Sequence, residues 1–184
     1  MAIEPKLYTV DEFERFLKRP ENRDRLFELV NGEIVEKMPT EEHGIIVLNI
    51  GTEIRILLKA NPIGRVGVEI RHGSPEDRYN DRIPDISFTA DTTTSVVTQG
   101  AVPRFPDLAV EVKSPDDSYR QMREKAAYYL ANGVKLVWLV YPEKRLIEVY
   151  RADGEIQILD EDDTLEGGNV LPGFSMTVSS IFTL

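Results

Sequence analysis

The sequence predicts one mixed α/β domain, residues 1–184, in which helices flank a central mixed β-sheet. The chain has 184 residues, of which 41% are hydrophobic and 29% charged, and this is the size and composition of one globular domain with a sizeable core. Segments with the apolar period of helices are interspersed with short apolar runs typical of strands. These two observations favour a sheet covered by helices over an all-helical or all-strand fold.

A helix and a β-hairpin are the first predicted elements. Thr9 and Glu12 have the spacing of a capping box, and apolar residues follow at helical intervals until Pro20 ends the helix. Strands over residues 26–30 and 33–35 flank Asn31-Gly32, the pair best suited to a two-residue type I′ turn. A long helix is predicted from about residue 41 to residue 59, where Asn61-Pro62 and Gly64 stop the apolar period.

The rest of the chain reads as strands around one further helix. Gly133 closes the predicted helix over residues 119–132, and a short helix with a flexible excursion is expected within residues 90–106. Trp138 and the Tyr128-Tyr129 pair are expected to pack in the core and on the helix. Apolar runs and alternation predict strands over residues 66–71, 83–88, 108–112, 136–140, 146–150 and 155–159, and residues 171–174 open a short closing segment.

Charge and cysteine content exclude several functions. The net charge is −10, and the last 33 residues carry seven acids and no Lys or Arg, which argues against a protein that coats nucleic acid non-specifically. The absence of Cys excludes disulfides, thiolate zinc sites and cysteine nucleophiles. The first residues lack a signal-peptide pattern and no apolar run approaches the roughly 18 residues of a membrane span, so a cytoplasmic location without membrane contact is predicted.

The strand at residues 107–113 combines an acid and a base. Side chains alternate along a strand, so Glu111 and Lys113 point the same way while Leu108, Val110 and Val112 form the opposite, apolar face. On these two residues alone, a salt bridge at the rim of the sheet is the simpler interpretation. The pair gains a chemical meaning only together with a second acid.

Asp85 is that second acid, because it lies in another short apolar segment, directly after Pro84. Two carboxylates at adjacent strand ends can hold Mg²⁺, which takes oxygen ligands and leaves other positions to water and substrate phosphates. Lys113 beside the ion could orient water or neutralise charge that develops on phosphorus. The alternative role of Asp85 is that of a turn residue or a helix cap.

The pattern Pro84-Asp85 followed by Glu111-Val112-Lys113 resembles the PD-(D/E)XK signature of restriction-endonuclease-like nucleases. From about Leu26 to Phe182 the chain is similar to the Uma-type restriction endonucleases, a bacterial family. Outside the signature, the resemblance is carried by residues 27–35, Pro39 with His43, residues 106–115, Lys125, Tyr128, Gly133-Val134, residues 138–140, Val149-Tyr150 and residues 171–174.

The resemblance implies a restriction-endonuclease-like core with the acids at the ends of the central strands. Asp85, Glu111 and the backbone carbonyl of Val112 would then be metal ligands, and Lys113 would assist the reaction. Lys125 in the following helix is the alternative lysine. Glu28 would join the metal shell unless it is only a cross-strand partner in the hairpin. His43 would contact phosphate unless its role is structural.

The sequence therefore predicts a Mg²⁺-dependent endonuclease that cleaves DNA, with Mn²⁺ as a possible substitute. RNA or a small nucleotide diester would need the same site, and a catalytically silent binding or scaffold protein could share the same fold. A homodimer is the expected assembly, because symmetric dimers are the commonest oligomers. To bind DNA despite the negative charge, the chain is expected to gather arginines on one side, namely Arg65, Arg71, Arg78, Arg82, Arg104, Arg120 and Arg123.

Overall fold

The chain forms two compact units, each described by itself. The computed structural model describes residues 6–184. The sheet unit consists of Pro39–Ile70, Pro84–Val96 and Phe105–Leu184, and the hairpin unit consists of the other described residues. The expectation of a single domain over residues 1–184 stays a prediction. No helix among residues 6–184 is long and apolar enough to cross a membrane.

A six-stranded mixed sheet is the centre of the sheet unit. β5 and β6 are parallel neighbours connected through helix α3 (Tyr119–Ala131), and all other neighbours in the sheet are antiparallel. Parallel strands need such a crossover, whereas antiparallel strands such as β7 and β8 are joined by a tight turn. In spatial order the strands are β3 (Arg65–Val68), β4 (Ile86–Thr89), β5 (Leu108–Val112), β6 (Leu136–Tyr141), β7 (Leu146–Arg151) and β8 (Ile156–Leu159).

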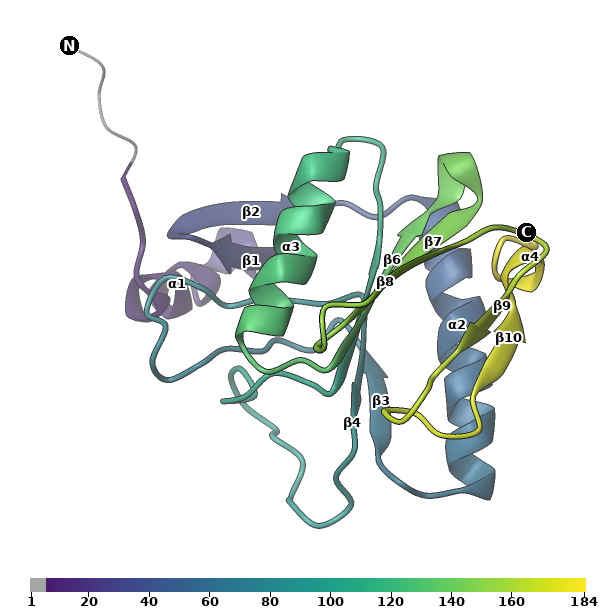
Figure 1. Cartoon of the computed structure of the whole chain (residues 1–184). Helices are drawn as coiled ribbons and strands as arrows, with labels where there is room; N and C mark the ends of the chain where they lie inside the picture. Colours follow the sequence, from purple (N-terminus) through teal and green to yellow (C-terminus); the bar gives the residue numbers. More distant parts are fainter. Residues whose placement is uncertain (1–5) are drawn as a thin grey trace. The chain divides into compact units, whose positions relative to one another are not determined.

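Two helices cover opposite faces of this sheet (Figure 1). Helix α2 (Glu41–Ala60) packs its buried isoleucines on the face formed by Leu108, Val110 and Val112. On the other face, Met122 and Ala126 of α3 pack with Ala109. Every residue of β5 is therefore buried, including Glu111, and a charged group on this strand must be satisfied inside the protein.

Short elements complete the sheet unit. β9 (Thr164–Glu166) and β10 (Ser175–Thr177) form a two-stranded antiparallel sheet, and helix α4 (Val178–Ile181) follows directly. A 3₁₀ helix, Pro142–Lys144, follows β6 directly. It brings Glu143 close to the end of β5, where Lys113 lies.

The hairpin unit begins with helix α1 (Val10–Leu17), in which Thr9 and Glu12 form the predicted capping box. A 3₁₀ helix, Pro20–Asn22, leads into strands β1 (Leu26–Val30) and β2 (Glu33–Lys37), which pair antiparallel. Asn31 and Gly32 have φ values of 51° and 84°, as a type I′ turn requires. The apolar centre of the hairpin unit consists of Phe13, Phe27 and Leu29.

Three expectations about secondary structure were wrong. β4 begins at Ile86 rather than at residue 83, since Pro84 has no amide hydrogen to donate to a ladder. β3 ends at Val68, because Glu69 has a φ of 52° that breaks the extended backbone. Residues 90–106 contain no helix, and the amides of Thr93 and Thr94 instead donate to the Asp91 side chain in a turn.

Candidate active site

Asp85 lies directly before β4 and is 2% exposed. Its Oδ2 accepts a hydrogen bond of 2.7 Å from the backbone amide of Val112, and the Nε2 of His43 lies 3.1 Å from the same oxygen. His43 is in the first turn of α2, whose N-cap Thr40 accepts from the His43 amide. The Asp85 carboxylate therefore joins β5 to the side chain of His43.

Glu111 carries the second buried carboxylate and is 1% exposed. Tyr129 donates a 2.6 Å hydrogen bond to its Oε1, and Lys125 Nζ lies 3.0 Å from its Oε2. Both donors come from α3, four residues apart, which places them on the same side of the helix. Tyr129 was expected only to pack, and the structure adds a charge-assisted hydrogen bond to this role.

The two carboxylates come from neighbouring strands at one end of the sheet. Ile86 pairs with Val110, so continuing the register by one residue places Asp85 opposite Glu111. The amide of Val112, next to Glu111, holds the Asp85 carboxylate. Burial makes each ionised carboxylate costly, and the basic and hydrogen-bonding partners reduce that cost. Such an arrangement holds two carboxylates in place at one end of the sheet.

Lys113 follows β5 and lines a cavity of about 290 Å³ together with His43 and Glu143. Its Nζ lies 3.2 Å from Glu143 Oε1 and donates to the carbonyl of Ser114. Burial raises the pKa of Glu143, but hydrogen bonds from the Tyr119 hydroxyl and from Lys113 outweigh it, so the pKa lies below its ordinary value. The cavity therefore has an ammonium group held at its wall by a charged carboxylate.

Lys113 and Lys125 take different positions, although either was a candidate for the reaction. Lys125 contacts the acid Glu111, whereas Lys113 lies on the wall of the cavity. The preference for Lys113 as the reacting lysine stays a prediction. Glu28 belongs to the hairpin unit, where it is 2% exposed and its Oε2 accepts from the amide of Ile83, and its place in the metal shell also stays a prediction.

The donor set of this site fits a divalent cation of the Mg²⁺ type. Asp85, Glu111 and the Val112 carbonyl offer only oxygen atoms, which hard cations prefer. Residues 6–184 contain no cluster of three or more His, Asp or Glu side chains that could hold a metal ion by themselves. Mg²⁺ commonly binds through one or two carboxylates and keeps several waters, so two protein carboxylates suffice.

A further buried carboxylate of the sheet, which the sequence did not single out, fixes α3 on the sheet. Glu148 of β7 lies in one row with Glu111, since both are paired with Leu139 of β6. It accepts hydrogen bonds from Arg123 of α3 at 2.6 Å, Tyr150 at 2.8 Å and Tyr141 at 3.1 Å. Helix α3 thus places one basic side chain on each of two sheet carboxylates.

The electrostatics of Glu148 follow from these contacts. Burial by itself raises the pKa of Glu148, but the hydrogen bonds from Arg123 and the two tyrosines lower it below its ordinary value. Burial and the neighbouring carboxylate raise the pKa of Tyr150 to about 12. The acid is therefore ionised and the tyrosine neutral near pH 7, which is the state in which their hydrogen bond forms.

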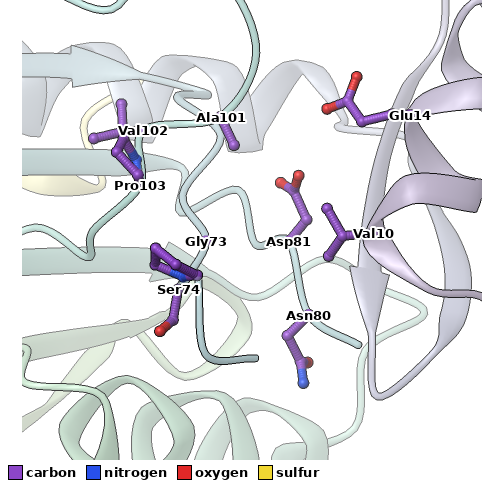
Figure 2. A pocket seen from close by; sticks show the side chains of 10 residues that line it. Val10, Glu14, Gly73, Ser74, Asn80, Asp81, Ala101, Val102 and Pro103 are labelled. Atoms are coloured by element: carbon purple, nitrogen blue, oxygen red, sulfur yellow. The ribbon is translucent and has the colours of Figure 1, made fainter. Parts of the chain in front are cut away.

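The hairpin unit contains a separate cavity of about 240 Å³ (Figure 2). Apolar residues such as Val10, Val102 and Pro103 form its walls, and Asp81 and Glu14 contribute carboxylates. Arg71 binds both acids but does not line the cavity, and burial raises the pKa of Asp81. None of the ten residues that line this cavity is basic, so it is unsuited to a phosphate group and is not the candidate site.

The six-stranded sheet and its two covering helices match the fold of restriction-endonuclease-like nucleases. A similar solved structure is the "Crystal structure of a putative nuclease belonging to DUF820 from Anabaena variabilis ATCC 29413". The two chains are 24% identical, with a TM-score of 0.76, over 92% of this chain and 96% of the other. The predicted fold class is confirmed.

The chain belongs to the Uma2 family, described as "Putative restriction endonuclease", whose model matches residues 10–179. The family resemblance seen in the sequence is thereby confirmed. No curated protein matches the sequence.

Proposed function

We propose that this protein is a metal-dependent phosphodiester hydrolase that cleaves DNA internally. The observation that carries the proposal is the pair of buried carboxylates, Asp85 and Glu111, beside a cavity lined by Lys113 and His43. Membership of the Uma2 family and the restriction-endonuclease-like fold support the same reaction class. The residues that line the cavity include no Ser or Cys, and the hydroxyl oxygen of Thr40 accepts from the His43 amide as a helix cap, so water is the proposed nucleophile.

In this proposal Asp85, Glu111 and the Val112 carbonyl hold the metal ion, with Mg²⁺ expected and Mn²⁺ as a substitute. When bound, the ion supplies Lewis-acid activation of water and neutralises charge on the phosphate. The Val112 amide and His43 fix the Asp85 carboxylate, while Tyr129 and Lys125 fix that of Glu111. Rigid carboxylates keep the ligands in place without reorganisation during the reaction.

Lys113 is the proposed contact for a phosphate oxygen. The Lys113 side chain is 9% exposed and lies on the cavity wall, where its ammonium group can donate to an anion with little competition from water. His43 lines the same cavity and is held through Nε2 by Asp85. Lys113 supplies the proposed hydrogen-bond donor to phosphate, and His43 holds the Asp85 carboxylate.

Several arginines that were expected to gather for DNA binding are engaged by acids instead. Arg71 pairs with Asp81 and Glu14, Arg65 lies 3.3 Å from Asp91, and Arg123 binds Glu148. With a net charge of −10 as well, the proposal includes weak non-specific affinity for DNA. A homodimer is also part of the proposal, and light scattering would test it.

The test is a cleavage assay with supercoiled plasmid, single-stranded DNA and RNA, each with Mg²⁺, with Mn²⁺ and with EDTA. Cleavage of DNA that needs the ion and is lost in Asp85→Asn supports the proposal. Preference for RNA would move the substrate to RNA with the same chemistry. No cleavage of any substrate, together with no divalent-ion binding by calorimetry, would indicate a binding or scaffold protein instead.

A further inference from the structure

Glu143 places a carboxylate on the wall of the cavity beside Lys113. Its Oε1 lies 3.2 Å from Lys113 Nζ and accepts a 2.7 Å hydrogen bond from the hydroxyl of Tyr119. One anionic oxygen therefore receives both an ammonium and a hydroxyl donor. The 3₁₀ helix after β6 supplies Glu143, and the first residue of α3 supplies Tyr119.

A phosphate oxygen can accept the same hydrogen bonds as this carboxylate oxygen. Lysine ammonium groups and tyrosine hydroxyls are both common donors to phosphate in nucleic-acid complexes. Lys113 follows β5 and Tyr119 begins α3, so a tetrahedral phosphate at the cavity of about 290 Å³ would meet donors from two elements. Lys113 and Tyr119 thus form a site for an anion, and the protein fills it with its own carboxylate.

The charges around the cavity explain why this carboxylate would control entry. Its lining contains four titratable groups, Glu42, His43, Lys113 and Glu143. The ammonium of Lys144 lies 4.0 Å from the centre of the Tyr119 ring and adds a positive charge nearby. With Glu143 in place, acids offset the basic groups. Without it, Glu42 is the one acidic group left in the lining, beside Lys113 and the nearby Lys144, so an anion is attracted more strongly than before.

Of the two partners, Glu143 is the more exposed and therefore the easier to displace. Its side chain is 44% exposed, whereas that of Lys113 is 9% exposed. The carboxylate can turn into water at small cost, but a nearly buried ammonium is stable only with an anionic or polar partner. When a phosphate takes the place of Glu143, the Lys113 ammonium group still has an anionic partner.

We propose that Glu143 occupies the position of a substrate phosphate oxygen and that Lys113 and Tyr119 bind this phosphate when Glu143 is displaced. The inference rests on the proposed function, because it names contacts to the same phosphodiester substrate. Tyr119 is then a substrate-binding residue, and Glu143 is a positioning residue that holds Lys113 in the free protein and selects for anions able to displace it.

Binding of inorganic phosphate to metal-free protein in EDTA tests the proposal, measured by calorimetry. Glu143→Gln and Glu143→Ala remove the negative charge beside the site, so both should bind phosphate about tenfold more tightly than the wild type. Glu124→Gln is the matched control, because Glu124 is an exposed acid of α3 paired with Arg120, and its affinity should equal that of the wild type. Urea unfolding of each variant confirms that it is folded.

Tyr119→Phe in the Glu143→Gln background should weaken phosphate binding several-fold, since one donor is lost. Equal phosphate affinity of the wild type and both Glu143 variants would overturn the proposal, as would an unchanged affinity after Tyr119→Phe. The measurement needs neither metal nor DNA. A protein with the expected phosphate affinities that cleaves nothing would contradict only the proposed function, and an active nuclease with unchanged affinities would contradict only this inference.

Discussion

Replacing Lys125 by methionine is expected to lower the free energy of unfolding by about 3–5 kcal/mol at pH 7. Lys125 Nζ lies 3.0 Å from Glu111 Oε2, and the two side chains are 15% and 1% exposed. At an effective dielectric constant of about 20, two charges at this distance attract by about 5–6 kcal/mol. Part of this attraction is offset in the wild type by the cost of taking the Lys125 ammonium group out of water on folding, a cost that the methionine variant does not have.

Urea unfolding measures this loss, followed by the fluorescence of Trp138, the single tryptophan of the chain, which is fully buried in β6. Lys135→Met is the matched control. Lys135 forms an equally short pair with Asp107, at 2.8 Å, but its side chain is 63% exposed, so the expected loss is about 1 kcal/mol or less. Equal losses in the two variants would refute the argument that burial gives the Glu111 pair its strength.

Three further predictions concern the same unit. Added Mg²⁺ should raise the urea midpoint of Lys125→Met more than that of the wild type, because the ion replaces the lost positive charge near Glu111; equal shifts would speak against a metal at this acid. Glu148→Gln should cost about 1–3 kcal/mol at pH 7. The pKa of Glu148 is lowered from 4.5 in the folded state, so its stabilising contribution is present above about pH 4.5 and is lost as the pH falls through the folded-state pKa. The unfolding free energies of the wild type and Glu148→Gln should therefore converge in acid. A difference that stays constant with pH would contradict this. Gly64→Ala should lower the melting temperature, because a Cβ there would lie 2.3 Å from the carbonyl oxygen of Thr89; an unchanged calorimetric transition would count against this close approach.

The elements that the sequence predicted well are those with local signals. The capping box at Thr9, the Asn31-Gly32 turn and Gly133 after α3 each fix a boundary through contacts or φ values within a few residues. β9, β10 and α4 escaped prediction because three or four residues are too few to show a period. Such short elements form because the surrounding chain packs on them.

The sequence indicated the acids of the candidate site but not their partners. Asp85 and Glu111 stand out because each is an acid in an apolar strand segment. That Lys125 and Tyr129 bind Glu111 depends on how α3 lies on the sheet, although their four-residue spacing in a predicted helix was a usable signal. Glu143 is brought to Lys113 only by the parallel pairing of β5 and β6, which no local pattern specifies.

The central claim is that Asp85 and Glu111 form the metal site of a DNA-cleaving enzyme. The most direct measurement is nicking of a supercoiled plasmid by protein freed of metal with EDTA, on return of Mg²⁺ or Mn²⁺, beside Asp85→Asn and Glu111→Gln. Each variant must first show a cooperative unfolding transition. We expect cleavage that returns with the ion in the wild type and is absent from both variants. Cleavage that persists in either folded variant, or in EDTA, would contradict the claim.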